Sequence, residues 1–144
     1  MNRKTDMIMA GGRHPMEITY SVGFKTNGKI TALKLDILLD AGIYQDVSLI
    51  IPEQVLGALK KYDGGALLFD IKVCKTNLPS GSVMRAPGDL QGSFIAEAVI
   101  EIASTLSIEV DSVRNINLHT YNSLEFFYKS RAGESGVYFT YNMG

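Results

Sequence analysis

The sequence predicts an α+β fold, in which an antiparallel hairpin and a further strand pack against one long apolar helix and a shorter second helix. Three features support this prediction: two-residue alternation of apolar and polar side chains early in the chain, a β-favouring apolar run near its middle, and three- and four-residue apolar spacing later. Because the strands precede these helices, the order favours an α+β arrangement over a regular βαβ series. The length of 144 residues suits one domain.

The predicted hairpin joins two strands through a tight turn. Its first strand covers Glu17–Phe24, where every second side chain is apolar. The turn contains Asn27 and Gly28, two residue types that accept the positive φ angles of a tight hairpin turn. The second strand separates two kinds of side chain: Leu33, Leu35, Ile37 and Leu39 lie on one face, and Lys34, Asp36 and Asp40 on the other.

The middle of the chain predicts a short helix and a third strand. The helix is expected around Glu53–Lys61 and is ended by the Gly64-Gly65 pair. The strand covers Leu67–Lys75, a run of apolar and β-favouring residues, and stops at the turn-forming residues 76–81.

Two helices are predicted after residue 88. The apolar face expected for the long helix consists of Phe94, Ile95, Ala98, Val99, Ile102, Ala103 and Leu106. The shorter helix is expected to begin near Asp111, ahead of Val113, Ile116 and Leu118. A weak strand signal follows at Val137–Tyr141.

Composition excludes several classes of protein. The chain has 14 Lys and Arg against 15 Asp and Glu and no basic stripe with interleaved aromatics, which argues against a nucleic-acid partner. The first residues lack the apolar core of a secretory signal or a membrane span, so we expect a cytoplasmic protein without a membrane partner. Cys74 is the only cysteine, which excludes an internal disulfide and an all-cysteine metal site within the chain.

Single reactive residues offer little catalytic chemistry. His14 and His119 lie far apart in the sequence, so no side-chain metal site is predicted and both are expected to be structural, with ring nitrogens bonded to nearby backbone. A Cys74 nucleophile with His119 as its base is one alternative, but the apolar run around Cys74 favours a buried core thiol. Asp36 and Asp40 form either a carboxylate pair or, as is more common on a strand face, solvated charges.

One loop offers a binding site for an anion. Residues 78–88 are rich in glycine, proline and serine and lead into the long apolar helix. The backbone N–H groups at such a helix start have no intrahelical partner, and they can bind an anionic ligand. Arg85 adds a fixed cation. The alternative is an ordinary strand-to-helix connection with a solvated arginine.

Three segments carry a family resemblance. The loop and the helix that follows it read CKTNLPSGSVMRAPGDLQGSFIAEAVIE, the earlier hairpin region reads GGRHPMEITYSVGFKTNGKITALKLDILLDAGIYQD, and a later segment reads NLHTYNSLEFFYKS. In this order they resemble the molybdopterin-binding region of the aldehyde oxidase and xanthine dehydrogenase family, especially plant aldehyde oxidases. The resemblance implies that residues 1–132 are part of the molybdopterin-binding domain and that residues 133–144 form a divergent C-terminal tail.

The resemblance implies a cofactor site in the loop. Arg85 corresponds to the family's arginine whose backbone amide faces the molybdenum, and Gln91 to the glutamine that closes the motif. Ala86 and Gly88 belong to the same cofactor-binding loop. It implies no catalytic residue and no side-chain metal ligand here, because the family's catalytic glutamate lies in a later segment. Three glutamates are not expected to replace it: Glu97, Glu101 and Glu125.

The resemblance also implies a reaction. Xanthine dehydrogenases place a purine-stacking aromatic where this chain has Pro87, and a purine-binding arginine near Gln54, so these departures favour aldehyde over purine oxidation. The implied parent is an oxidoreductase that converts aldehydes to carboxylic acids at a molybdenum cofactor and passes electrons through iron–sulfur clusters and FAD. It is expected to be a homodimer.

The iron–sulfur motifs, the flavin domain and the catalytic glutamate lie outside this sequence, so we expect an inactive fragment that needs the remainder of the enzyme. The alternatives are a non-catalytic interaction fragment and a fragment of a purine hydroxylase.

Overall fold

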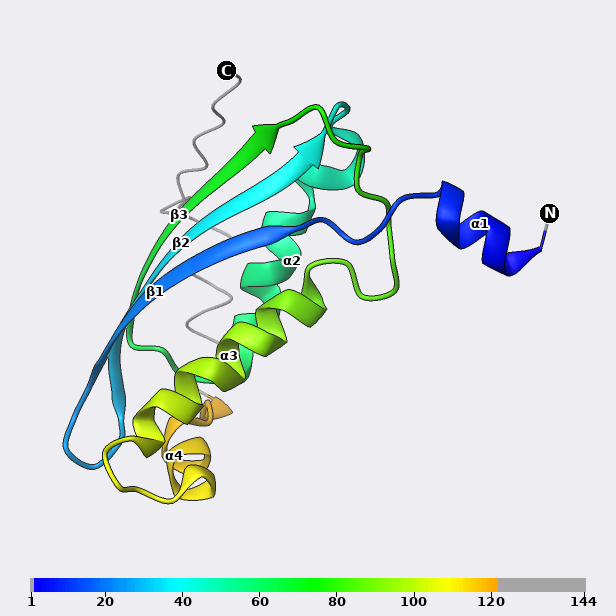
Figure 1. Ribbon diagram of the computed structural model, residues 1–144. Helices are drawn as coiled ribbons and strands as arrows, with labels where there is room; N and C mark the ends of the chain where they lie inside the picture. Colours follow the sequence, from blue (N-terminus) through cyan, green and yellow to red (C-terminus); the bar gives the residue numbers. More distant parts are fainter. Residues whose placement is uncertain (1, 122–144) are drawn as a thin grey trace.

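The computed structural model describes residues 2–121 and consists of one sheet with helices on one of its faces (Figure 1). The strands are β1 (Met16–Phe24), β2 (Ile30–Gly42) and β3 (Ala66–Lys75), in the spatial order β1-β2-β3. The helices are α1 (Arg3–Met9), α2 (Ile51–Ala58), α3 (Asp89–Ser104) and α4 (Val110–Asn117), with 3-10 turns η1 (Asp46–Leu49) and η2 (Leu59–Lys61). This confirms the α+β prediction.

The predicted hairpin is confirmed, and its turn is longer than expected. β1 and β2 are antiparallel, with Ile18 opposite Ile37 and Tyr20 opposite Leu35. The predicted tight turn at Asn27-Gly28 is part of a longer connection, residues 25–29. Of these two residues, only Gly28 has the expected positive φ, 84°. The register shifts at Gly23/Phe24, and such a bulge adds the residue that a longer loop needs.

The third strand is confirmed and lies parallel to β2, with Leu35 beside Phe69 and Ile37 beside Ile71. The chain reaches it through α2, which begins two residues before the predicted helix and continues through η2 to Lys61. Pro52 fits the first turn of α2 because its missing N–H has no partner to lose there. The helices α2 and α3 cover the same face of the sheet (Figure 1).

The core lies between the sheet and these two helices. The four predicted apolar residues of β2 are buried, together with side chains from β3 and the helices: Leu33, Leu35, Ile37, Leu39, Ile71, Val73, Val55, Leu56, Ile95, Val99 and Ile100. The opposite face of the sheet, called here the open face, is not covered by any helix that the structure describes (Figure 1).

The predicted apolar face of the long helix is partly wrong. Ile95 and Val99 are buried, but Phe94 is 76% exposed and Leu106 lies beyond the helix and is exposed; the Ala103 side chain lies outside the described part. The rotation of α3 is fixed by Gly92, where an added Cβ would come within 2.3 Å of the Val55 carbonyl oxygen. This close approach turns the neighbouring side of α3 towards α2 and leaves Phe94 outside.

The shorter helix starts earlier than predicted. Its N-cap is Glu109, whose carboxylate accepts from the Ser112 N–H at 3.1 Å, and not Asp111. Val113 is buried as predicted, whereas Ile116 and Leu118 are partly exposed. The predicted strand at Val137–Tyr141 and the tail 133–144 lie outside the described residues. Among residues 2–121, no helix has the length and apolarity required to cross a bilayer.

Candidate functional site

Residues 76–88 connect β3 to α3, and their larger part is called here the 79–88 loop. The segment before β1 holds this loop in place. The Ser82 N–H donates to the Gly12 carbonyl at 2.9 Å. Next to this bond, a Cβ on Gly81 would lie 2.8 Å from the His14 ring. Two segments nearly 70 residues apart in sequence therefore lie side by side, which Figure 1 shows where the chain passes from α1 to β1.

His14 supports this contact from the interior. The ring is buried and its Nε2 is hydrogen-bonded to Ser48 Oγ at 3.0 Å. The structural role was predicted correctly, but the partner is a side-chain hydroxyl and not backbone. Burial lowers the pKa of His14, and the carboxylates of Asp46 and Asp40 offset part of that effect. The neutral ring is thus the form that suits the folded chain.

Arg13 holds the far end of the loop. Its Nη2 donates to the Arg85 carbonyl at 2.9 Å and its Nη1 to the Ala86 carbonyl at 3.0 Å. Ala86 has a φ of 54°, in the left-handed region that non-glycine residues avoid. Sequence reasoning selected Arg85 and missed Arg13, because nothing in the local sequence around Arg13 indicates a partner more than 70 residues away.

The predicted site residues come together at the end of this loop. The backbone N–H groups of Arg85 and Ala86 have no acceptor among residues 2–121, and the Arg85 side chain is exposed. The Leu90 N–H donates to the Ala86 carbonyl at 3.4 Å, so the loop leads directly into the first turn of α3. Gln91 lies in that turn, and its Oε1 is buried without a hydrogen-bond partner in the described part of the chain.

Gly88 fixes the loop against α2. Its φ is 76°, and an added Cβ would lie 2.6 Å from Gln54 Cβ and 2.7 Å from the Ile51 carbonyl oxygen. The structure thereby brings Gln54 next to the Pro87–Gly88 segment. These are the two places where the sequence departs from the purine-oxidising pattern, so both lie at the same site.

The other reactive residues do not form a site. Cys74 is half-buried in register with Asp40 on the open face, so its predicted core position was wrong; Ile71 and Val73 occupy the core side of β3. His119 lies near Asp63 at the other end of β3, far from Cys74. No group of three or more His, Cys, Asp or Glu side chains in the described residues is placed to hold a metal ion.

The two strand carboxylates have separate structural roles. Asp36 pairs with Lys34 at 2.9 Å on the open face. Asp40 accepts from Thr76 Oγ1 at 2.7 Å and from the Gly42 N–H at 2.8 Å, and so organises the end of the sheet. Asp36 is therefore a surface charge, as the solvated interpretation predicts, whereas Asp40 is a part-buried hydrogen-bond acceptor and not a solvated charge.

Glu97, in the middle of α3, belongs to an ion-pair cluster with residues of η2 and α4. Its carboxylate accepts from Lys61 Nζ, from the Tyr62 hydroxyl at 3.0 Å and from Arg114 Nη2 at 3.1 Å. The hydrogen bond from Lys61 lowers the pKa of Glu97, and the bonds from Tyr62 and Arg114 add to it against the effect of burial. This carboxylate ties α3 to η2 and α4.

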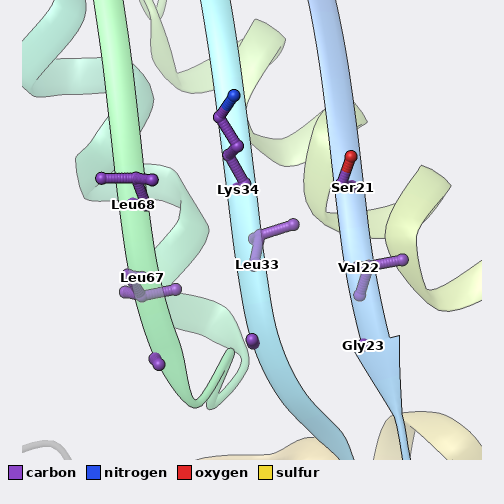
Figure 2. Close-up of a pocket in the computed structure, with 9 residues that line it drawn as sticks. Ser21, Val22, Gly23, Leu33, Lys34, Leu67 and Leu68 are labelled. Carbon is purple, nitrogen blue, oxygen red and sulfur yellow. The ribbon is translucent and has the colours of Figure 1, made fainter.

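The open face has a shallow hollow that crosses all three strands (Figure 2). Small residues from adjacent strands, Gly23, Ala32 and Ala66, line it together with Lys34 and Leu68. Leu68 is 61% exposed and Leu38, further along the same face, is 43% exposed. The hollow is lined mainly by apolar side chains, and the face around it carries the ion pairs Lys34–Asp36 and Lys72–Asp70.

Comparisons with known proteins identify the family of the chain. The sequence pattern of the molybdopterin cofactor-binding domain family matches residues 1–118. Over 139 residues the chain is 66% identical to an indole-3-acetaldehyde oxidase and 61% identical to abscisic-aldehyde oxidase, both of Arabidopsis thaliana. Each alignment covers 96% of this chain and 10% of the relative, so the chain spans about a tenth of their length.

Solved structures share the fold. The aldehyde oxidoreductase from Desulfovibrio gigas superposes with a TM-score of 0.69 at 23% identity, over 77% of this chain and 12% of that one. Quinoline 2-oxidoreductase from Pseudomonas putida 86 superposes with a TM-score of 0.67 at 19% identity, over 78% of this chain and 15% of that one. The observed arrangement of sheet and helices is therefore an architecture that occurs within much larger oxidoreductases.

Proposed function

The chain belongs to the molybdopterin cofactor-binding domain family, and from this premise we propose that its 79–88 loop and the first turn of α3 form a wall of a molybdenum-cofactor cavity. The proposed parent activity is the oxidation of aldehydes to carboxylic acids by a molybdenum hydroxylase. Residues 1–132 are proposed to be the part of the molybdopterin-binding domain that this chain contains. The catalytic glutamate, iron–sulfur clusters and FAD belong to other parts of that parent enzyme.

One observation carries the proposal: a buried, unpartnered Gln91 Oε1 lies one turn from two exposed backbone amides that also lack an acceptor among the described residues. Buried polar atoms in native proteins almost always have a partner, so the Gln91 amide suits a ligand that is itself polar. A side-chain amide both donates and accepts, which fits the mixed donors and acceptors of a pterin.

The proposed cofactor roles fall on four residues. Arg85 and Ala86 would supply backbone N–H donors, and Gln91 would supply its side-chain amide. Gly88 would act indirectly, by allowing the loop to pack against α2. The cofactor supplies the redox chemistry when bound, whereas the chain binds and orients it, so no side-chain metal ligand is needed.

The aldehyde class is supported by the relatives and by the loop. The names of the similar plant proteins specify indole-3-acetaldehyde and abscisic aldehyde. Pro87 and Gln54 replace the aromatic and the arginine of the purine-oxidising pattern, and Gln54 lies against Gly88, the residue after Pro87. The proposal includes a cytoplasmic location and a homodimeric parent, without a nucleic-acid or membrane partner.

The test is binding of molybdopterin to the purified 144-residue chain, followed by pterin fluorescence. Arg85→Ala keeps the backbone amide and is expected to bind within a few-fold of the unmodified chain, whereas Arg85→Pro removes the N–H and is expected to weaken binding at least about tenfold. Circular dichroism checks that both variants fold. Absence of binding by the unmodified chain, or equal binding by Arg85→Pro, contradicts the proposal.

A second candidate function is a non-catalytic interaction module, favoured by the exposed Leu38 and Leu68 on the open face. Large exposed apolar surfaces mark interaction sites. A related full-length subunit is the proposed partner. Loss of association after Leu68→Lys, with molybdopterin binding unchanged, would support this role independently of the loop.

A further inference from the structure

Arg13 contacts the loop at Arg85 and Ala86, whose backbone N–H groups have no acceptor among residues 2–121. One guanidinium donates to two successive carbonyls, those of Arg85 at 2.9 Å and Ala86 at 3.0 Å. We infer that Arg13 is the positioning residue that fixes the backbone of Arg85 and Ala86 for ligand binding. This inference rests on the proposed function of the loop and assigns Arg13 a role in that site.

The backbone at Ala86 needs such support. Its φ of 54° lies in the left-handed region, where the Cβ of an L-residue crowds the following carbonyl. A strained conformation of this kind persists only when the surrounding structure fixes it. Gly88 also has a positive φ but no Cβ, whereas Ala86 has one. The Ala86 carbonyl accepts from Arg13 Nη1 at 3.0 Å and from the Leu90 N–H at 3.4 Å, and the second Arg13 bond holds the preceding carbonyl, that of Arg85.

The bond to the Arg85 carbonyl also determines which way the Ala86 N–H points. The described peptide bonds are all trans, and in a trans peptide the C=O and the following N–H point in opposite directions. Because the Arg85 carbonyl faces Arg13, the Ala86 N–H faces away from it. The guanidinium thus turns a donor outward without touching the ligand.

Arg13 is itself held in place on both sides. The Gly12 carbonyl accepts from the Ser82 N–H, and the His14 ring is buried against Gly81. The planar fork of an arginine spans two acceptors in a fixed geometry, which a lysine ammonium does not reproduce. Arg85, in contrast, is exposed and forms no side-chain hydrogen bond or ion pair with the described residues.

The test compares Arg13→Gln and Arg13→Lys with the unmodified 144-residue chain. The first readout needs no cofactor: ¹⁵N relaxation and the HN–Hα coupling at Ala86 report the order and the φ of the loop. We expect the Ala86 order parameter to fall from about 0.85 to below about 0.6 in both variants. The second readout is molybdopterin affinity, which should fall at least about tenfold. Arg3→Gln, an equal charge change in α1, is the control and should alter neither.

The outcomes separate this inference from the proposed function. An unchanged order parameter and coupling at Ala86 in Arg13→Gln overturns the positioning role, even when the unmodified chain binds molybdopterin. Full affinity in Arg13→Lys also overturns it, because charge alone would then suffice. Failure of the unmodified chain to bind contradicts the proposed function and is seen before any variant is compared.

Discussion

Two side-chain amides at opposite ends of the sheet differ in how completely they are hydrogen-bonded. At the α4 end, Asn117 is fully buried and all its bonds are made: Nδ2 donates to the carbonyls of Gly28 and Val113, and Oδ1 accepts from the Ile30 N–H, each at 2.9 Å. At the loop end, Gln91 is held in the first turn of α3 with a buried Oε1 that has no partner among residues 2–121. The same chemical group is a structural tie in one place and an open acceptor in the other.

The charges follow the same division. At the α4 end, Glu97 pairs with Lys61 and Arg114, and Asp63 pairs with Lys29 at 2.8 Å. Burial raises the pKa of Asp63, but the hydrogen bonds from Lys29 and the Gly65 N–H outweigh it, so the pKa lies below its ordinary value. At the loop end, the Arg85 guanidinium has no ion pair in the described part. The difference supports the proposal that the loop end receives a ligand, whereas the ion pairs at the α4 end stabilise the fold.

The largest expected effect is at Asn117. Asn117→Ala leaves the buried Ile30 N–H and Gly28 carbonyl without partners, and we expect a loss of about 3 kcal/mol in the free energy of unfolding. Urea denaturation measures it. Asn115→Ala, an exposed position on the same helix, is the matched control and should stay within about 0.5 kcal/mol. An equal loss of stability in Asn117→Ala and Asn115→Ala would contradict the structural role assigned to Asn117.

Gly88→Ala should cost about 2 kcal/mol in stability, because the φ of 76° disfavours a side chain and the added Cβ meets Gln54 and the Ile51 carbonyl. Molybdopterin binding should weaken as well. Gly57→Ala in α2 is the control, since a Cβ there meets nothing within 4 Å. It should raise the free energy of unfolding by about 0.5–1 kcal/mol. A tolerated Gly88→Ala would show that the loop does not need its close contact with α2.

The change in the free energy of unfolding expected for Gln91→Met has the opposite sign to that expected for Asn117→Ala. Replacing an unpartnered buried amide by an apolar side chain of similar size should stabilise the cofactor-free chain by about 1 kcal/mol. The same variant should bind molybdopterin at least about tenfold more weakly. Thermal denaturation and fluorescence titration measure the two effects. A destabilised variant would mean that the Gln91 amide has a structural partner, as Asn117 does.

The two ends should also respond to different ranges of pH. The pKa of His14 is lowered by burial, so the unfolded chain takes up a proton first and stability falls as the pH drops below about 6.5. The pKa of Glu97 is lowered by Lys61, so its smaller contribution is lost only below about pH 4.3. Urea denaturation of His14→Asn between pH 7.5 and 5.5 should show a flatter profile than that of the unmodified chain. An identical slope would exclude His14 as the cause.

Local sequence patterns predicted the structural features that depend only on residues close together in the sequence. The alternation in β1 and β2 placed Leu33, Leu35, Ile37 and Leu39 in the core, because the two-residue period of a strand determines which face each side chain occupies. The rotation of α3 could not be predicted in this way. It depends on the approach of Gly92 to Val55, a contact between helices that spacing along one helix does not contain.

The candidate site likewise has residues that the sequence predicted and residues that it did not. The loop, with Arg85 and Gln91, was identified from its composition, its place before a helix and its family resemblance. Arg13 was not, because its partners are the carbonyls of Arg85 and Ala86, and backbone groups give no signal in a sequence. The parallel pairing of β3 with β2 and the half-buried place of Cys74 depend likewise on which strands meet.

The most direct test of the account locates the bound ligand. A ¹⁵N-labelled 144-residue chain is titrated with molybdopterin, and the amide chemical shifts are followed residue by residue. We predict that the shifts concentrate at Arg85, Ala86 and the Gln91 side chain, with the Asn117 amide unchanged. Shifts concentrated at Lys34 and Leu68 on the open face, or no shifts at all, would contradict the claim that the 79–88 loop is the cofactor-binding end of this molecule.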